Sequence, residues 1–283
     1  MDPSSLTPLA GGWSGETFLA DVGGERCVVR IYARPGDRGD AAPEIDAALL
    51  QLVRGLVPVP DVLEVRRGDA ATDAPGLLVT SFVDGIRGDE LLPGLGDQEL
   101  ATVGQHVGAL AATLAAMPML RVGPFLDAEL RIGSFDVPDG LPAYVEDLGL
   151  LELRGVAEEA QALLDTVTRC SLVHSDLNPK NLLLDPDTLR VTALVDWEFA
   201  HAGHPFTDLG NVLRVDRFPL YVDAVLAAFT DRLGGTPGDA LALARAADLW
   251  ALIDLASRAG QNPVADCAHA LLADIARTGN LSG

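Results

Sequence analysis

The chain has 283 residues, 48% of them hydrophobic, and it carries 41 acidic against 20 basic side chains, for a formal charge of -21. Nineteen of the basic residues are arginine, and Lys180 is the only lysine. A P-loop needs a lysine that closes a glycine-rich turn. Residues 175–181 read SDLNPKN, so this motif is excluded. Because the chain has a single lysine, Schiff-base chemistry could use only Lys180. The negative net charge disfavours a polybasic surface that binds membranes or nucleic acids.

Taken in chain order, the first eighty residues are rich in β-forming side chains. Gly23-Gly24 separates two such runs and predicts a hairpin, and a glycine- and serine-rich turn lies ahead of it at residues 11–17. Pro43 marks the first turn of a helix. The predicted segments are strands at 16–22 and 26–33, a helix at about 42–54, and short strands at 61–67 and 76–82.

Beyond Asp84-Gly85 the apolar residues recur with helical periodicity. The predicted helices cover about 97–117, 156–168, 220–233, 239–258 and 264–276. Two short apolar runs, NLLLD and RVTALVD, flank the turn Asp185-Pro186-Asp187 and predict a hairpin inside this helical part. Strands followed by helices indicate an α+β fold.

A length near twice the usual domain predicts one large domain or two lobes. Cys27, Cys170 and Cys267 form no C-x-x-C pair, which argues against a zinc site and a disulfide framework. No basic-then-apolar leader opens the chain, and the longest apolar run, residues 107–120, is too short to span a bilayer. We therefore expect a cytoplasmic protein without membrane or nucleic-acid partners, and we leave its oligomeric state open.

The clearest chemistry lies in LVHSDLNPKNLLLD, followed by ALVDWEFAHAGHPFTDLGN. His174 and Asp176 lie two residues apart, Asn181 follows Asp176 by five, and Asp196 ends the next predicted strand. An H-x-D-x-x-x-x-N loop followed by such an Asp is the arrangement of kinase-like phosphoryl-transfer enzymes. Mg²⁺ prefers carboxylate or amide oxygens together with phosphates and water. Asn181 and Asp196 are therefore the predicted Mg²⁺ ligands, and Asp176 is left to accept or orient the proton of the acceptor hydroxyl.

These motifs resemble the aminoglycoside phosphotransferase family, a kinase-like group that also contains choline and other small-molecule kinases. The second motif, D-W-E-x-A-x-x-G-x-P-x-x-D-L, is filled here by residues 196–209. The resemblance implies a bilobal protein-kinase-like fold. A small β-rich N-lobe with one helix would cover residues 1–84, and a larger helical C-lobe carrying the catalytic hairpin would cover 85–283. The implied activity is Mg²⁺-dependent transfer of the γ-phosphoryl group of ATP or GTP to the alcohol group of a small molecule.

The resemblance also implies roles for single residues. It makes Asp176 the catalytic base, Asp208 a buried anchor of the catalytic loop, and His174 a hydrogen-bonding partner that orients this loop. We expect Trp197 to pack in the core. For Glu198 we weigh packing against an influence on metal or substrate.

The N-lobe matches less closely, because Arg30 stands where protein kinases have a phosphate-binding lysine. Arginine offers a charged, bidentate fork, so a phosphate-binding role is expected for Arg30, with a solvated strand arginine as the alternative. Glu44 on the following helix is its expected partner. Asp46 is the rival, because the register of that helix is open.

Further nucleotide contacts follow from the resemblance alone. The turn at Ser14-Gly15 would cover the phosphates. Residues 81–85 would form the hinge between the lobes, and backbone groups from Ser81 to Val83 would bind the adenine edge.

Lys180 lies between the predicted base and the first metal ligand. A flexible cation at this position would reach the transferring phosphoryl group, where negative charge accumulates. We therefore count Lys180 with the catalytic residues, and a solvated loop lysine is the alternative.

The acceptor is the most open question. Residues 85–208 hold 20 acidic against 7 basic side chains, which favours a cationic acceptor such as an aminoglycoside or amino alcohol. Helix faces that are simply exposed to solvent also carry an excess of acidic residues, so a sugar or another metabolite is an equally compatible acceptor. The candidate acids of this segment are Asp89, Glu90, Asp147, Glu152, Glu158 and Glu159, with Asp248 and Asp254 as weaker candidates near the C-terminus.

Two other functional classes share part of this pattern. A nucleotide-binding pseudoenzyme would explain the arginine in place of lysine, but Asp176, Asn181 and Asp196 are all present. A protein kinase is disfavoured, because Gly203-His204-Pro205 leads almost directly to Asp208 and leaves no room for a long activation loop.

Overall fold

The computed structural model describes residues 6–9, 16–33, 38–69, 71–72, 74–214 and 218–281. The chain forms two compact units, each assembled from separate stretches. Unit 1 comprises Met1–Glu99, Gly123–Gly133 and Asn178–His201, and unit 2 comprises Leu100–Val122, Ser134–Leu177 and Ala202–Gly283. Because the units interleave along the chain, they do not test the predicted lobe boundary at residue 84, which stays a prediction.

Unit 1 is built on an antiparallel sheet in the order β1-β2-β3-β5-β4. Its strands are β1 (Thr7–Pro8), β2 (Glu16–Val22), β3 (Glu25–Tyr32), β4 (Val62–Arg66) and β5 (Gly76–Ser81). The hairpin between β2 and β3 is confirmed. Gly23 and Gly24 turn the chain with φ angles of 67° and 88°, which glycine adopts without strain.

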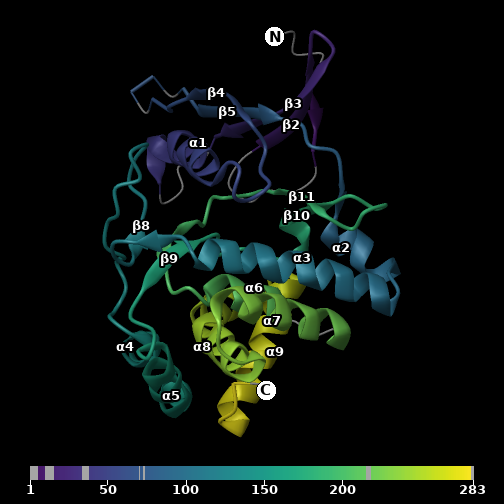
Figure 1. Ribbon diagram of the computed structural model, residues 1–283. Helices are drawn as coiled ribbons and strands as arrows, with labels where there is room; N and C mark the ends of the chain where they lie inside the picture. The colour runs from purple at the N-terminus through teal and green to yellow at the C-terminus, as the bar shows by residue number, and fades with distance from the viewer. Residues whose placement is uncertain are drawn as a thin grey trace. The chain divides into compact units, whose positions relative to one another are not determined.

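One helix covers part of this sheet. Helix α1 (Ala42–Val53) packs against β4 and β5 (Figure 1). It buries Ile45, Leu49 and Val53, which recur every four residues along one face. The strands contribute their own small core of Ala20, Cys27, Val29 and Val79. The hydrophobic pattern of α1 therefore explains why this single helix stays on the sheet.

Unit 1 also holds the hairpin that was predicted inside the helical part. Strands β10 (Leu182–Leu184) and β11 (Val191–Leu194) pair antiparallel, and β6 (Ile86–Arg87) adds to the free side of β10. The side chain of Asp185 closes the turn by accepting hydrogen bonds from the N–H groups of Asp187 and Thr188, both at 2.9 Å. This turn fixes the register of the two strands that carry the predicted metal ligands.

Unit 2 is mostly helical. Its helices are α3 (Asp97–Ala115, from Leu100 onward), α4 (Leu141–Asp147), α5 (Arg154–Leu164), α6 (Thr207–Leu213), α7 (Pro219–Leu233), α8 (Pro237–Ala256) and α9 (Pro263–Thr278). Helix α8 contacts α5, α6, α7 and α9, and its Leu249 and Leu252 lie in the main core of the unit (Figure 1). Among the described residues, no helix combines the length and apolar character that crossing a membrane requires.

Two glycines bring α3 and α7 into close contact. A Cβ on Gly104 would lie 2.5 Å from the carbonyl oxygen of Tyr221, and one on Gly108 would lie 2.3 Å from that of Val225. Any larger side chain at these positions would push the helices apart. These glycines therefore set the distance between the two helices.

Short elements complete the two units. In unit 2, β7 (Pro118–Met119), β9 (Cys170–Val173) and β12 (His201–Gly203, from Ala202 onward) are neighbours in that order. The remaining short elements are β8 (Gly123–Pro124), α2 (Gly88–Leu91) and the 3-10 helices η2 (Gly39–Ala41), η3 (Leu92–Gly94), η4 (Leu151–Leu153) and η5 (Pro179–Asn181). Antiparallel sheets combined with separate helices confirm the predicted α+β class.

Candidate active site

The two predicted metal ligands lie side by side in unit 1. Asn181 directly precedes β10 and Asp196 closely follows β11, so the antiparallel pairing of Leu182 with Leu194 brings them to the same end of the hairpin. The backbone N–H of Val195 donates to the carbonyl oxygen of Asn181 at 3.0 Å. One amide and one carboxylate oxygen suit Mg²⁺, which takes one or two such ligands beside phosphates and water. The donor set therefore fits the ion.

Asp196 has an unusual backbone conformation. Its φ angle is 66°, in the left-handed region that few residues other than glycine adopt. Such conformations cost about 1 to 3 kcal/mol and persist where the surrounding structure enforces them, often at functional sites. The indole N–H of Trp197 donates to the carbonyl oxygen of Leu194 at 3.1 Å, and this contact helps to hold the turn.

Arg30 of β3 lies against this turn. Its Nη1 is 2.7 Å from Oδ1 of Asp196, and its Nη2 is 2.5 Å from Oε2 of Glu198. The three side chains are only 14%, 23% and 12% exposed, respectively. Burial lowers the pKa of Arg30, but the charges of Asp196 and other nearby acids raise its pKa on balance. A fixed cation therefore stands beside the predicted metal ligand, and Glu198 is its second partner.

Glu44, the expected partner of Arg30, pairs elsewhere, and Asp46, the rival, acts on Arg30 through its charge, which raises the pKa of Arg30. Glu44 makes a partly exposed ion pair with Arg67 at 3.1 Å. Asp46 is buried and binds Arg38, and it also accepts a hydrogen bond from the hydroxyl of Tyr32 at 2.6 Å. The acids that pair with Arg30 lie more than 160 residues away in sequence, which helix periodicity cannot show.

Lys180 lies on η5 and is exposed. Its backbone N–H donates to the side chain of Asn178 at 3.1 Å, which caps this short helix. Because Asn181 is the next residue, the turn carries the lysine beside the first predicted metal ligand. Its role as a catalytic cation remains a prediction.

Asp176 belongs to unit 2, on the loop that follows β9. Asp208 in the first turn of α6 accepts hydrogen bonds from the backbone N–H groups of His174, at 2.9 Å, and Ser175, at 2.8 Å. His174 is fully buried, and its Nδ1 accepts a hydrogen bond from the N–H of Asp176 at 3.3 Å. Ser175 is left-handed, with a φ angle of 67°. These are the contacts expected of a buried anchor and a loop-orienting histidine.

The electrostatics of Asp208 follow from its burial. Removal from water raises the pKa of Asp208 to about 7. The two donated N–H groups lower this pKa, and the charge of Asp176 raises it further. Asp208 therefore holds the backbone of the loop as a carboxyl group that titrates near neutral pH.

The predicted hinge lies in unit 1. The backbone N–H of Ser81 donates to the carbonyl oxygen of Asp61, and its hydroxyl accepts from the N–H of Asp61, so Ser81 is engaged at the end of β5. Val83 follows on a segment without regular secondary structure. The predicted phosphate-covering turn at Ser14 and Gly15 lies outside the described residues.

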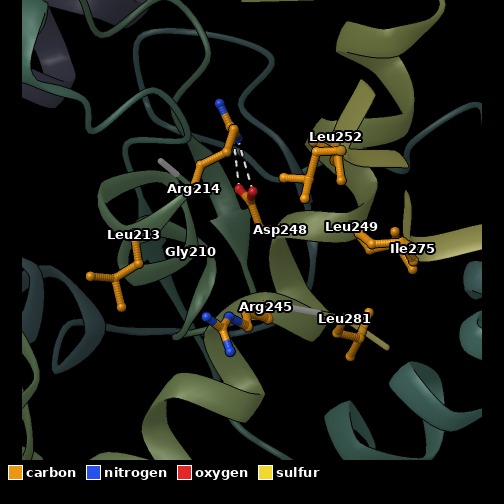
Figure 2. Close-up of a pocket in the computed structure, with 10 residues that line it drawn as sticks. Gly210, Leu213, Arg214, Arg245, Asp248, Leu249, Leu252, Ile275 and Leu281 are labelled. Atoms are coloured by element: carbon orange, nitrogen blue, oxygen red, sulfur yellow. Dashed lines mark hydrogen bonds and ion pairs between the residues drawn. The ribbon is translucent and has the colours of Figure 1, made fainter. Parts of the chain in front are cut away.

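The candidate acceptor acids differ in their surroundings. Figure 2 shows Arg214 pointing at Asp248 beside a cavity of about 60 Å³ in unit 2. Asp248 is buried and accepts hydrogen bonds from Arg214, at 2.7 and 2.8 Å, and from Asn211 at 3.1 Å. Asp248 is therefore already neutralised and is unsuited to bind an amine. The six acids of the middle segment are all exposed, and Asp89 and Glu158 pair with nearby arginines.

Arg38 is not among the residues predicted from the sequence. It binds Asp46 and also donates to the carbonyl oxygen of Ala200. One signal was available. On a helix, Asp46 falls on the same face as Leu50 and Val53, and an acid on an apolar face needs a partner. The identity of that partner depends on the tertiary structure.

The chain was compared with known proteins. The sequence profile of the Phosphotransferase enzyme family (APH) matches residues 5–243. An aminoglycoside 3'-phosphotransferase of Streptomyces fradiae is 29% identical over 238 residues, which cover 79% of this chain and 85% of that protein.

Solved structures of low sequence identity share the fold. Aminoglycoside phosphotransferase APH(4)-Ia superposes with a TM-score of 0.69 at 20% identity and covers 98% of this chain and 94% of its own. A thermostable mutant of APH(4)-Ia, in a ternary complex with AMP-PNP and hygromycin B, gives 0.67 at 23% identity with the same coverage. The chain therefore belongs to the APH family of phosphotransferases and has its kinase-like α+β fold.

Proposed function

We propose that this protein is a Mg²⁺-dependent kinase that moves the γ-phosphoryl group of ATP or GTP to a hydroxyl group of a small, amine-bearing molecule. The observation that carries the proposal is the cluster in unit 1. Asn181 and Asp196 offer oxygen ligands at adjoining strand ends, and the half-buried cation of Arg30 lies 2.7 Å from Asp196. Because the donor nucleotide is a cytoplasmic metabolite, we place the protein in the cytoplasm.

Each residue of the candidate site has a proposed task. Asp176 orients the acceptor hydroxyl and accepts its proton, and Asp208 and His174 hold the loop that carries it. Arg30 binds the phosphates of the donor, and Lys180 stabilises charge on the transferring group. When bound, Mg²⁺ neutralises phosphate oxygens, with Asn181 and Asp196 as its ligands.

The remaining nucleotide contacts would come from the segment after β5 and from the turn before β2. We assign the adenine edge to the segment from Ser81 to Val83 and the phosphate cover to Ser14 and Gly15. Glu44 was expected to support this site, but it pairs with Arg67 on the partly exposed side of α1. We therefore leave it without a role in binding.

The relatives favour an amine-bearing acceptor. The Streptomyces fradiae protein is an aminoglycoside 3'-phosphotransferase, and the mutant APH(4)-Ia was crystallised with a nucleotide analogue and hygromycin B. The acidic middle segment of this chain agrees with such a substrate. The alternative is a kinase whose acceptor carries no amine, such as a sugar or another metabolite, and the assay must distinguish it from a kinase of amine-bearing acceptors.

A coupled assay of ADP formation tests the proposal. The purified protein is given MgATP or MgGTP and, in parallel, aminoglycosides, amino alcohols and neutral sugars. We expect stimulation by amine-bearing compounds, and a loss of at least about 100-fold in kcat for Asp176→Asn, because general-base contributions are of this size. Lys180→Ala should lower kcat at least about tenfold with little change in nucleotide affinity.

The outcomes separate the alternatives. Stimulation by neutral sugars alone would reject the amine-bearing acceptor and keep the kinase. Nucleotide binding without turnover on any acceptor would indicate a pseudoenzyme. Full activity of Asp176→Asn would reject the assignment of the base.

A further inference from the structure

We propose that Arg38 is a positioning residue, which fixes the segment after the metal ligand Asp196 by holding the carbonyl group of Ala200 against α1. The inference rests on the proposed function, because it assigns Asp196 to Mg²⁺. Through Arg38, α1 is linked to the proposed metal site independently of Arg30 on β3.

The contacts of Arg38 reach two separate parts of unit 1. Its Nη1 donates to Oδ1 of Asp46 on α1, and its Nη2 donates to the carbonyl oxygen of Ala200 at 2.5 Å. The Arg38 side chain is 11% exposed and that of Asp46 is 4% exposed. The hydroxyl of Tyr32 donates to the other oxygen of Asp46 at 2.6 Å. Both carboxylate oxygens of Asp46 are thus occupied, and the bond from Arg38 is the one that connects α1 to the carbonyl group of Ala200.

The segment held by Arg38 has a conformation that needs support. Asp196 is in the left-handed region, with a φ angle of 66°. The chain then folds back, because the N–H of Ala200 donates to the carbonyl oxygen of Trp197 at 3.0 Å. A bond to the carbonyl group of Ala200 therefore restrains the turn four residues after the metal ligand, and Arg30 restrains it through Glu198. Fixing outer contacts of this kind orients metal ligands.

The choice of arginine fits two simultaneous contacts. Burial lowers the pKa of Arg38, although the charge of Asp46 opposes this effect. A buried pair of this kind is weak evidence for stability alone and is often kept for structural specificity. The planar guanidinium can bind a carboxylate and a carbonyl oxygen in fixed directions, whereas a lysine is a single point charge. Arg38→Lys therefore keeps a charge beside Asp46 and loses the fixed bridge to Ala200.

A titration of Mg²⁺ tests the proposal without turnover. Fluorescent mant-ADP is bound to the full-length protein, and Mg²⁺ is added from an EDTA-treated start. For Arg38→Lys we expect the Mg²⁺ concentration at half-saturation to rise at least about tenfold, as for other residues that orient metal ligands. Tyr32→Phe is the matched control. It removes the other side-chain contact of Asp46, keeps the ring beside Arg30, and should leave the titration within about twofold of the wild type.

A second variant guards against misfolding. The double substitution Arg38→Gln/Asp46→Asn removes both charges together, so no buried charge is left alone. It should fold, as judged by circular dichroism, and show the same weakened Mg²⁺ dependence. Equal Mg²⁺ half-saturation in the wild type and both Arg38 variants would overturn the proposal.

The wild-type protein separates this inference from the proposed function. If it does not bind mant-ADP at all, the proposed function fails and the inference falls with it. If it binds mant-ADP equally with and without Mg²⁺, the metal role of Asp196 is wrong and the positioning role is rejected. Mg²⁺-dependent binding in the wild type with unchanged Arg38 variants rejects the inference alone.

Discussion

The ion pairs of Arg30 predict a measurable loss of stability when its charge is removed. Arg30→Met keeps the aliphatic length and leaves the carboxylates of Asp196 and Glu198 side by side. Breaking a fully buried pair costs about 3 to 5 kcal/mol. Asp196 is 23% exposed, so solvent screens part of this cost. We expect the free energy of unfolding to fall by about 2 to 3 kcal/mol.

Arg26 on the same strand provides a matched control. It forms an ion pair with Asp84 at 2.8 Å, but the two side chains are 49% and 80% exposed. Arg26→Met should therefore change the free energy of unfolding by about 0 to 1 kcal/mol. Both substitutions replace a strand arginine with the same side chain, so their difference isolates the effect of burial and of the second carboxylate.

Urea unfolding followed by circular dichroism, in EDTA and without nucleotide, measures both variants. The double variant Arg30→Met/Glu198→Gln should recover about 1 kcal/mol, because it removes one of the two facing charges. The reasoning is refuted if Arg30→Met is as stable as the wild type, or if its loss equals that of Arg26→Met. Strictly additive losses in the double variant would show that Arg30 and Glu198 do not interact.

Four further outcomes are expected. Gly108→Ala should destabilise the protein by about 1 to 3 kcal/mol, because its Cβ would lie 2.3 Å from the carbonyl oxygen of Val225. Gly155→Ala meets no atom within 4 Å and should stabilise α5 by up to about 1 kcal/mol, and equal urea midpoints for the two variants would contradict this. Because the pKa of Asp208 is raised to about 7, its contribution to stability is lost as pH rises from about 4 to 7. Unfolding of Asp208→Asn should lack that slope. Burial lowers the pKa of His204 to about 4, so its contribution is lost as pH falls from about 6.5 to 4, a slope that His204→Phe should remove.

Much of the fold follows from local sequence patterns. The strand pair around Gly23 and Gly24, helix α1 and helices α7 to α9 lie close to where alternation, helical periodicity and turn residues predict them. Helices α4 and α6 were missed. Each is seven residues long, and two turns are too few for a periodic signal.

In the candidate site, too, the features set by local spacing could be predicted and those set by long-range contacts could not. The neighbouring positions of Asn181 and Asp196 could be predicted, because a strand–turn–strand motif fixes both ends of a hairpin from local spacing, whereas their role as metal ligands stays a prediction. The partners of Arg30 could not, since they come from a segment 166 and 168 residues away. Arg38 was missed for the same reason, as its contact with Ala200 spans 162 residues. Local spacing indicates which residues carry chemistry, and only the tertiary contacts show which charges balance them.

The left-handed backbone at Asp196 has a consequence for how this position would evolve. Glycine or asparagine would adopt that conformation with less strain than aspartate. Both substitutions would also remove the ion pair with Arg30, so a library randomised at residue 196 and selected only for soluble expression weighs relief of strain against loss of that ion pair. The same library selected for phosphotransfer should return to aspartate. Divergence between the two selections would show that function, and not folding stability alone, keeps aspartate at this residue.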